Sequence, residues 1–186
     1  MRKRSLIAAV LVACAVCSAR NMLKNGEMRT SKGWTTWGDT PRDAASKAKI
    51  ITYVKEGPNG ARVLKFNDCF TLYNPYLIQL IPVSGVTEEQ KYHVKFSLKA
   101  DKGRSVTVML QMFRPDEERK LKFLGGRQFV AKGTGEWTDY ETTFTRPYPD
   151  ATHFGLSFNP IPYERASDKK QTCSFLLTNV SLELEK

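Results

Sequence analysis

The chain has 186 residues, of which 41% are hydrophobic and 11% aromatic, a composition that is typical of a folded globular protein and excludes a disordered one. Its formal charge is +10, but basic and acidic residues alternate along most of the sequence. Even the densest basic stretch, residues 114–127, is interrupted by Asp116, Glu117 and Glu118. We therefore expect no nucleic-acid partner, because nucleic-acid-binding proteins carry a denser basic patch on a recognisable module.

Residues 1–19 have the pattern of an export signal, in which the basic residues 2–4 precede an apolar run from Leu6 to Ala13 that is too short to span a bilayer. Two processing sites fit. Residues 17–19 offer the small side chains that a signal peptidase recognises, whereas residues 11–14 resemble a bacterial lipobox in which Cys14 is lipidated. We favour the lipidated form slightly and expect a cell-surface or outer-membrane lipoprotein, or otherwise a secreted or periplasmic protein. Removing residues 2–4 leaves the exported part with a charge of +7.

Two of the four cysteines, Cys69 and Cys173, fall within the exported part. In an oxidising compartment they are a candidate disulfide, worth on the order of 4 kcal/mol by loop entropy. The alternative is a pair of free thiols, buried as small hydrophobic groups. We expect no metal site of the zinc type, because His93 and His153 are the only histidines and the spacing typical of metal ligands is absent.

Residues 20–186 form a single domain in which glycine-, proline- and asparagine-rich turns separate short β-rich runs. Near its start, Trp34 is expected in the core. Trp37, next to Gly38, is the better candidate for a partly exposed ring. Residues 39–49 are expected to form a polar loop, with a helical turn as the alternative. Strands are expected at residues 21–24, 49–55, 61–67, 76–83, 92–100, 105–113, 122–130, 136–145, 153–159 and 174–185.

The run at residues 76–83 contains one polar residue, Gln79, and follows a cluster of aromatic residues that includes Tyr73 and Tyr76. An amide beside planar rings suits sugar recognition, since rings stack on C–H surfaces and an amide hydrogen-bonds to hydroxyls. The alternative, equally weighted, is a core strand in which Gln79 bonds to the backbone.

The runs at residues 92–100 and 105–113 alternate apolar and polar side chains, as a strand with one buried face does. In the second run, the face away from the core carries Thr107, Met109, Gln111 and Phe113, so that Gln111 and Phe113 become candidate contacts on the sheet surface. Nine or ten short strands without a long amphipathic helix predict an all-β fold, a β-sandwich jelly roll of two antiparallel sheets.

The order of these features resembles the carbohydrate-binding modules of the family 4/9/22 type. The resemblance rests on residues 21–26 followed by Gly33-Trp34, on Gln79 before Gly85, and on residues 92–96, 136–145 and 179–182. It implies a jelly roll whose concave sheet, or the loops at its rim, binds oligosaccharides without cleaving them. By position it assigns sugar contacts to Tyr73, Tyr76 and Gln79.

Modules of this type commonly hold a structural calcium ion with an acidic residue after the first Asn-Gly turn and an aspartate before the closing strand. This sequence has Arg29 and Thr178 at those two positions. Because a calcium ion there would lose charged oxygen ligands and face a guanidinium group, we expect no metal and no other cofactor. The alternative is a weak calcium site formed by Glu27 and backbone carbonyls.

We therefore predict a non-catalytic module that binds oligo- or polysaccharide through ring stacking and amide hydrogen bonds. Its candidate contacts are Trp37, Tyr73, Tyr76, Gln79, Gln111 and Phe113. An enzyme is not expected, because glycosidases need two carboxylates roughly 5–9 Å apart and the run Asp116 to Glu118 is typical of a solvated loop. The alternative is a structural or adhesive cell-surface lipoprotein with the same fold and no sugar binding.

Overall fold

The structure is a computed structural model that describes residues 20–67, 74–160 and 174–185. The export signal with Cys14, the candidate disulfide Cys69–Cys173 and the candidate contact Tyr73 lie outside these residues. The described parts form ten strands, a short α-helix and a turn of 3-10 helix at Pro58–Gly60. The strands and helix are β1 (Thr35–Asp39), α1 (Ala44–Ala48), β2 (Ile51–Val54), β3 (Val63–Phe66), β4 (Asn74–Pro82), β5 (Lys91–Ala100), β6 (Ser105–Pro115), β7 (Leu121–Lys132), β8 (Thr138–Thr145), β9 (His153–Asn159) and β10 (Phe175–Leu184).

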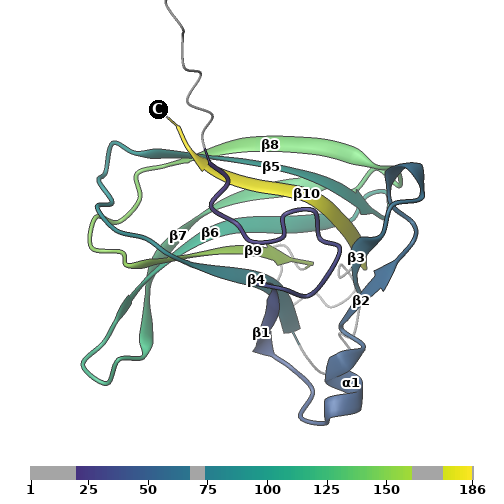
Figure 1. Ribbon diagram of the computed structural model, residues 1–186, viewed down its shortest axis with the longest axis horizontal. Helices are drawn as coiled ribbons and strands as arrows, with labels where there is room; N and C mark the ends of the chain where they lie inside the picture. The colour runs from purple at the N-terminus through teal and green to yellow at the C-terminus, as the bar shows by residue number, and fades with distance from the viewer. Residues whose placement is uncertain (1–19, 68–73, 161–173, 186) are drawn as a thin grey trace, which may run out of the picture.

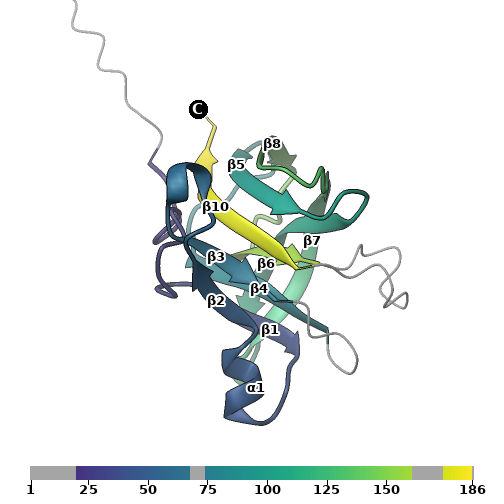
Figure 2. The ribbon, with the colours of Figure 1, turned by 90° about the vertical axis from the view of Figure 1, so that its right-hand side faces the viewer.

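The strands pair into two antiparallel five-stranded sheets that stack as layers (Figures 1 and 2). One sheet, called here the groove sheet, has the order β1-β4-β9-β6-β7, and the other, the outer sheet, has the order β2-β3-β10-β5-β8. This arrangement confirms the predicted β-sandwich. Within the described ranges, no helix is long and apolar enough to cross a membrane.

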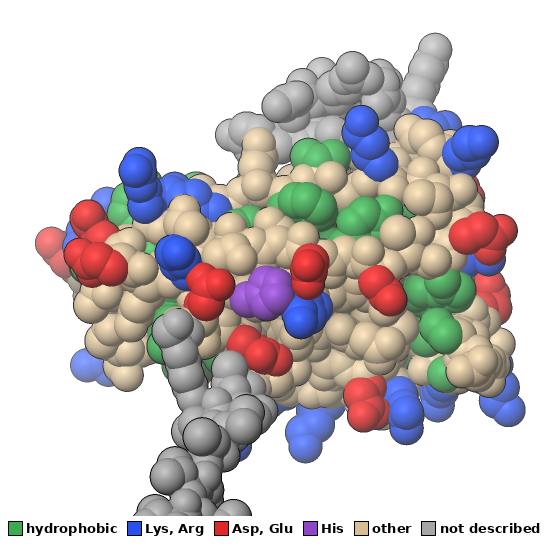
Figure 3. Space-filling model, turned by 90° about the horizontal axis from the view of Figure 1, so that it is seen from above, with side chains coloured by type: hydrophobic (Ala, Val, Ile, Leu, Met, Phe, Trp, Pro, Cys, Tyr) green, Lys and Arg blue, Asp and Glu red, His purple; other side chains and the backbone are tan. Residues whose placement is uncertain are grey.

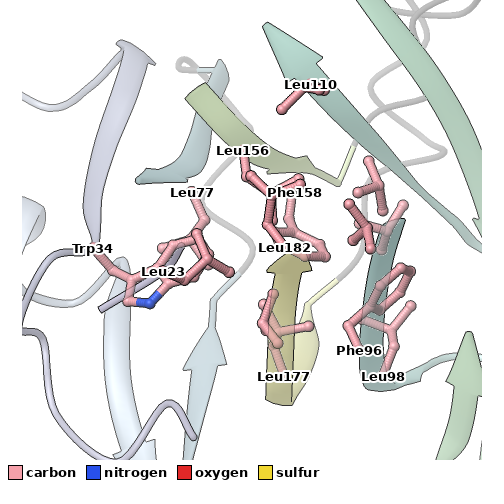
Figure 4. Close-up of a cluster of buried hydrophobic side chains, with 14 of the residues drawn as sticks. Leu23, Trp34, Leu77, Phe96, Leu98, Leu110, Leu156, Phe158, Leu177 and Leu182 are labelled. Carbon is pink, nitrogen blue, oxygen red and sulfur yellow. The ribbon is translucent and has the colours of Figure 1, made fainter. Parts of the chain in front are cut away.

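The core lies between the layers and is built from alternate residues of both sheets (Figure 4). The sequence alternation explains it, since Val94, Phe96 and Leu98 on β5 all turn inward and are at most 2% exposed. Phe96 meets Phe158 of the opposite sheet edge-to-face, with ring centroids 5.2 Å apart. Trp34 joins this core as predicted, and its side chain is 4% exposed.

Two local expectations were wrong. Residues 44–48, expected as part of a polar loop, form the one-turn helix α1, because the Asp43 carboxylate accepts a hydrogen bond from the Ser46 N–H and caps it. Residues 21–24 form no strand.

The segment from residue 20 to residue 34 packs instead against β10, where the Met22 N–H donates to the Leu182 carbonyl at 2.8 Å. The Val180 N–H donates to the Gly26 carbonyl at 2.7 Å. A Cβ atom on residue 26 would lie only 2.0 Å from the Val180 carbonyl oxygen. The glycine of the Asn-Gly pair is therefore required by close backbone approach.

Candidate functional site

The candidate site lies on the face of the groove sheet that points away from the core. Along β6, Val106, Val108 and Leu110 turn inward and are fully buried, while Met109 and Gln111 turn outward and are half-buried. Side chains from all five strands of this sheet share the outward face, since each strand alternates in the same way.

Aromatic rings meet across this face from distant strands. Trp37 on β1 contacts Phe113 on β6 edge-on with ring centroids 5.6 Å apart, and Phe113 contacts Phe123 on β7 at 5.7 Å. Trp37 pairs with Tyr76, which lies near the start of β4. Phe113 pairs with His153 of β9, and His153 pairs in turn with Pro82, the last residue of β4. The two rings are therefore attached at opposite ends of β4. Rings attached so far apart meet only if the sheet bends towards them, so this face is concave.

Small residues on β9 form the floor beneath the rings. At Gly155 a Cβ atom would lie 2.7 Å from the end of Ile78 and 3.0 Å from the Phe113 ring. Phe113 therefore lies across the glycine and is only 4% exposed, although it starts from the outward face. Ser157, the next outward residue on β9, is 1% exposed and is also small enough for side chains from β4 and β6 to cover it.

Beside these rings runs a groove of about 700 Å³, a volume that accommodates a small oligosaccharide. Its walls combine an exposed ring, three side-chain amides and a phenol. The lining residues are Tyr76, Met109, Gln111, Phe113, Phe123, Gly126, Arg127, Gln128 and Asn159. Phe123 is the most exposed ring among them at 54%.

A hydrogen-bond network holds the polar groups in the middle of the groove. The Gln111 Nε2 group donates to Ser157 Oγ at 3.0 Å, and Ser157 Oγ in turn donates to the Met109 carbonyl at 3.4 Å. Burial raises the pKa of the Tyr76 phenol above its usual value, and a hydrogen bond with the Gln111 side chain partly offsets the shift. Tyr76 is therefore a neutral hydroxyl at physiological pH.

The groove is lined without a carboxylate, and its one cationic residue turns elsewhere. Arg127 pairs along the sheet with the core-facing Leu110, so its side chain starts on the other side of β7. Its guanidinium donates to the carbonyls of Thr145 and Arg146 at 3.2 and 2.7 Å and stacks over the Tyr148 ring at 5.5 Å. The polar surface offered by the groove is therefore neutral.

Four of the six sequence-predicted contacts come together here: Trp37, Tyr76, Gln111 and Phe113. Gln79 does not join them. It lies on the inward side of β4, is 2% exposed, and exchanges two hydrogen bonds with the backbone of Lys24 at 2.6 and 2.9 Å. The structure therefore corresponds to the alternative in which Gln79 bonds to the backbone, and the amide is not available to a sugar.

Several residues of the site were not found from the sequence: Phe123, Gln128 and Asn159 in the lining of the groove, and the buried Ser157 beneath it. Residues 122–130 were recognised as a strand, but the register of β6 and β7 shifts between Met112 and Phe113. This shift places Phe123 opposite Phe113, which alternation read from the sequence alone does not reveal. The alternation along β9 could have indicated Ser157 and Asn159. Phe154, Leu156 and Phe158 point into the core, so the residues between and after them point to the opposite face.

At the positions of the calcium ligands considered in the sequence analysis, protein groups bond to one another. Thr178 Oγ1 donates to the Glu27 carbonyl at 3.0 Å, and the Glu27 carboxylate pairs with Arg29 at 3.1 Å. In the described part of the chain, no three Asp, Glu, His or Cys side chains gather as metal ligands would. A hydroxyl proton and a guanidinium group stand where calcium needs anionic oxygens, so the residues present do not fit the ion.

The acidic run of the β6–β7 connection has a structural role. Asp116 accepts hydrogen bonds from the N–H groups of Glu118 and Lys120 at 3.0 and 2.8 Å, and Glu118 pairs with the Lys120 side chain. These groups form the turn at the exposed tip of the hairpin, as the solvated-loop interpretation predicted. The opposite, outer sheet presents basic and acidic side chains intermixed (Figure 3), without a continuous patch of one sign on the face shown.

A β-sandwich with a ring-lined concave groove and no paired carboxylates among its lining residues has the architecture of a binding module. The chain belongs to the carbohydrate-binding domain family of the 4/9 type, whose sequence profile matches residues 20–165. The module is of a non-catalytic class, and a domain of this kind also occurs joined to an enzyme. No curated protein matches the chain.

Solved structures share the fold at low sequence identity. A module of family 61 in complex with β-1,4-galactotriose is 19% identical with a TM-score of 0.54, over 90% of this chain and 100% of that one. A xylan-binding family 22 module of Paenibacillus barcinonensis Xyn10C is 17% identical with a TM-score of 0.56, and the match covers 87% of this chain and 97% of that module. The enzymatically active domain of tailspike protein 4 from bacteriophage CBA120 reaches 0.59 at 12% identity; the match spans 89% of this chain but only 21% of the tailspike chain.

Proposed function

We propose that the domain binds a single chain of neutral oligosaccharide in the concave groove of β4, β9, β6 and β7. The observation that carries this proposal is the exposed Phe123 ring beside the amides of Gln111 and Gln128. A ring supplies an apolar surface for the C–H face of a sugar, and the amides supply donors and acceptors for its hydroxyls.

Neutral sugars are favoured over acidic ones by the charge of the groove. No carboxylate lines it, and the Arg127 guanidinium is held by the carbonyls of Thr145 and Arg146. A uronic acid would thus lose hydration without gaining a charged partner, which is costly in a partly buried site.

Single chains are favoured over crystalline polysaccharide by the ring geometry. A flat crystal face needs rings that lie in one plane. Here the planes of Trp37 and Phe113 are 75° apart and those of Phe113 and Phe123 are 59° apart. Such tilted rings on a concave sheet suit a chain that enters the groove. The solved modules that bind galactotriose or xylan support this class of ligand through the shared fold.

A glycan array with residues 20–186 tests the proposal, followed by titration of the best ligand. We expect micromolar affinity, or about 6–8 kcal/mol. Phe123→Ala should weaken binding by at least about tenfold. Leu184→Ala removes an exposed apolar side chain from β10 in the other sheet, away from the groove lining, and should leave affinity unchanged. Retention of no glycan, which the structural or adhesive alternative predicts, or equal effects of the two substitutions would overturn the proposal.

We further propose that the module is exported and anchored through a lipidated Cys14, on the basis of the basic, apolar and lipobox-like segments of residues 1–19. Palmitate labelling of the full chain should be lost in Cys14→Ser and retained in Cys17→Ser. Labelling that is absent, or that survives Cys14→Ser, would contradict the anchor.

A further inference from the structure

We infer that Ser157 is a positioning residue: it fixes the Gln111 side-chain amide so that its oxygen, and not its nitrogen, faces the groove. This inference rests on the proposed function for its consequence, but its geometry stands without a ligand. Ser157 is 1% exposed and is not among the residues that line the groove, so it acts through Gln111.

The direction of the hydrogen bonds follows from a backbone carbonyl. Ser157 Oγ lies 3.4 Å from the Met109 carbonyl oxygen and 3.0 Å from Gln111 Nε2. Both hydrogen bonds are made together only if the serine proton points towards Met109, because a carbonyl oxygen only accepts. The serine oxygen then has only lone pairs left for Gln111 and must accept a hydrogen bond. The group that faces Ser157 is therefore the NH₂ end of the amide, and Oε1 is turned away from it.

The neighbours of Ser157 maintain this arrangement. In the register of β9, Ser157 lies between Ile78 of β4 and Met109 of β6, with both flanking strands hydrogen-bonded to it. The Met109 carbonyl, which determines the direction of both hydrogen bonds, therefore cannot move without breaking the backbone pairing of β6 and β9. The direction is set by the backbone of the sheet and not by a mobile side chain.

The consequence is a groove that offers a preformed acceptor to a sugar hydroxyl. Without this contact the Gln111 amide keeps the Tyr76 phenol as a partner but loses a second restraint, and ordering it on binding then costs more free energy. Ser157 removes part of that cost before the ligand arrives. Its loss should weaken binding by about threefold to tenfold without removing any atom that touches the sugar.

The first test needs no ligand. In ¹⁵N-labelled protein, the Gln111 side-chain NH₂ signals should be displaced from those of free glutamine and exchange slowly with solvent, and both properties should move towards those of free glutamine in Ser157→Ala. The matched control is Ser97→Ala, which removes another buried serine hydroxyl, bonded to Asp139 on the outer sheet. Gln111 signals that already match those of free glutamine in the native chain, or that are unchanged in Ser157→Ala, would overturn the inference.

The second test is a double-mutant cycle measured by calorimetric titration with β-1,4-galactotriose and xylohexaose. Ser157→Ala should weaken binding in the native background and have no further effect in Gln111→Ala, because its action passes through that amide. Losses that simply add would overturn the inference. Absence of binding by the native chain to these and to every arrayed glycan would refute the proposed function instead, and the NMR test would still decide the role of Ser157.

Discussion

Thr107 and Thr178 are two buried threonines, 1% and 5% exposed, that differ in whether the hydroxyl has a partner. Thr178 donates to the Glu27 carbonyl. Thr107 Oγ1 is fully buried and finds no partner within the described residues. Since an unsatisfied buried hydroxyl costs free energy while a satisfied one contributes it, the same substitution should act in opposite directions at the two positions.

We predict that Thr107→Val raises the free energy of unfolding by about 0.5–1 kcal/mol, because valine keeps the shape and removes the unsatisfied group. Thr178→Val should lower it by about 1–2 kcal/mol, since the Glu27 carbonyl loses its donor. Urea denaturation of both variants measures the two changes. Destabilisation of similar size in both would show that Thr107 has a partner.

The phenols of Tyr53, Tyr76 and Tyr92 give a pH-dependence prediction. Burial raises the pKa of each above the value of 10.0 for a free tyrosine. A raised pKa means that the folded state holds the proton more tightly. The associated stability is thus fully present below pH 10 and is lost as the pH rises through the folded-state values.

Urea denaturation between about pH 9 and about pH 11 should accordingly show a falling free energy of unfolding, and the triple variant Tyr53→Phe, Tyr76→Phe, Tyr92→Phe should show a shallower fall. An equally steep fall in the triple variant would assign the alkaline loss to other groups.

Among the elements, β9 determines the depth of the groove through the size of its outward residues. Gly155 lies under Phe113, and β7, on the far side of β6, contributes Gly126 under Met109. The two glycines differ in what an added methyl group would meet. At Gly155 it meets the rigid Phe113 ring and the buried Ile78, whereas at Gly126 the nearest atom is the flexible Met109 sulfur at 3.0 Å.

We predict that Gly155→Ala costs about 1–3 kcal/mol of stability and weakens glycan binding, because Phe113 must move and Trp37 and Phe123 rest on it. Gly126→Ala should cost less than about 1 kcal/mol, since methionine adapts. Thermal melts and the titration used for Phe123→Ala compare the variants. Equal losses of stability in the two variants would contradict the prediction, because they would show that Phe113 moves aside as easily as Met109.

The sequence predicted those features of the strands that depend on neighbouring residues, and it missed those that depend on segments remote in sequence. The strand alternation of residues 105–113 correctly placed Gln111 and Phe113 on one face, because side-chain direction in a strand follows from sequence position alone. The direction of Gln79 was not decided in this way, since its partner, the backbone of Lys24, is remote in sequence. Phe123 was missed for the same reason: a register shift between two strands is a property of the pair.

At the scale of the whole molecule, direct contacts join the first described segment to β10. The Thr178–Glu27 bond and the backbone bonds of residues 22 and 26 hold this segment in place. These contacts give the expectation that no calcium binds here a direct test.

We predict that the melting temperature is the same, within about 1 °C, in EDTA and in millimolar calcium chloride, because calcium that does not bind cannot stabilise the folded state. Thr178→Asp places a carboxylate beside the Glu27 carbonyl and is the variant in which calcium should raise the melting temperature. A rise of several degrees in the native chain, measured by calorimetry, would reveal a calcium site and contradict the assignment.

The position of β10 has a consequence for how the domain forms. It is the last strand of the fold, yet it lies in the middle of its sheet between β3 and β5 and also holds residues 22 and 26. Until residues 175–184 have left the ribosome, the outer sheet is divided into two parts that cannot join. Folding must therefore wait for the end of the domain, and its rate is set by closing a loop that spans nearly all of it. The core between the two sheets is therefore completed late, when β10 joins β3 and β5.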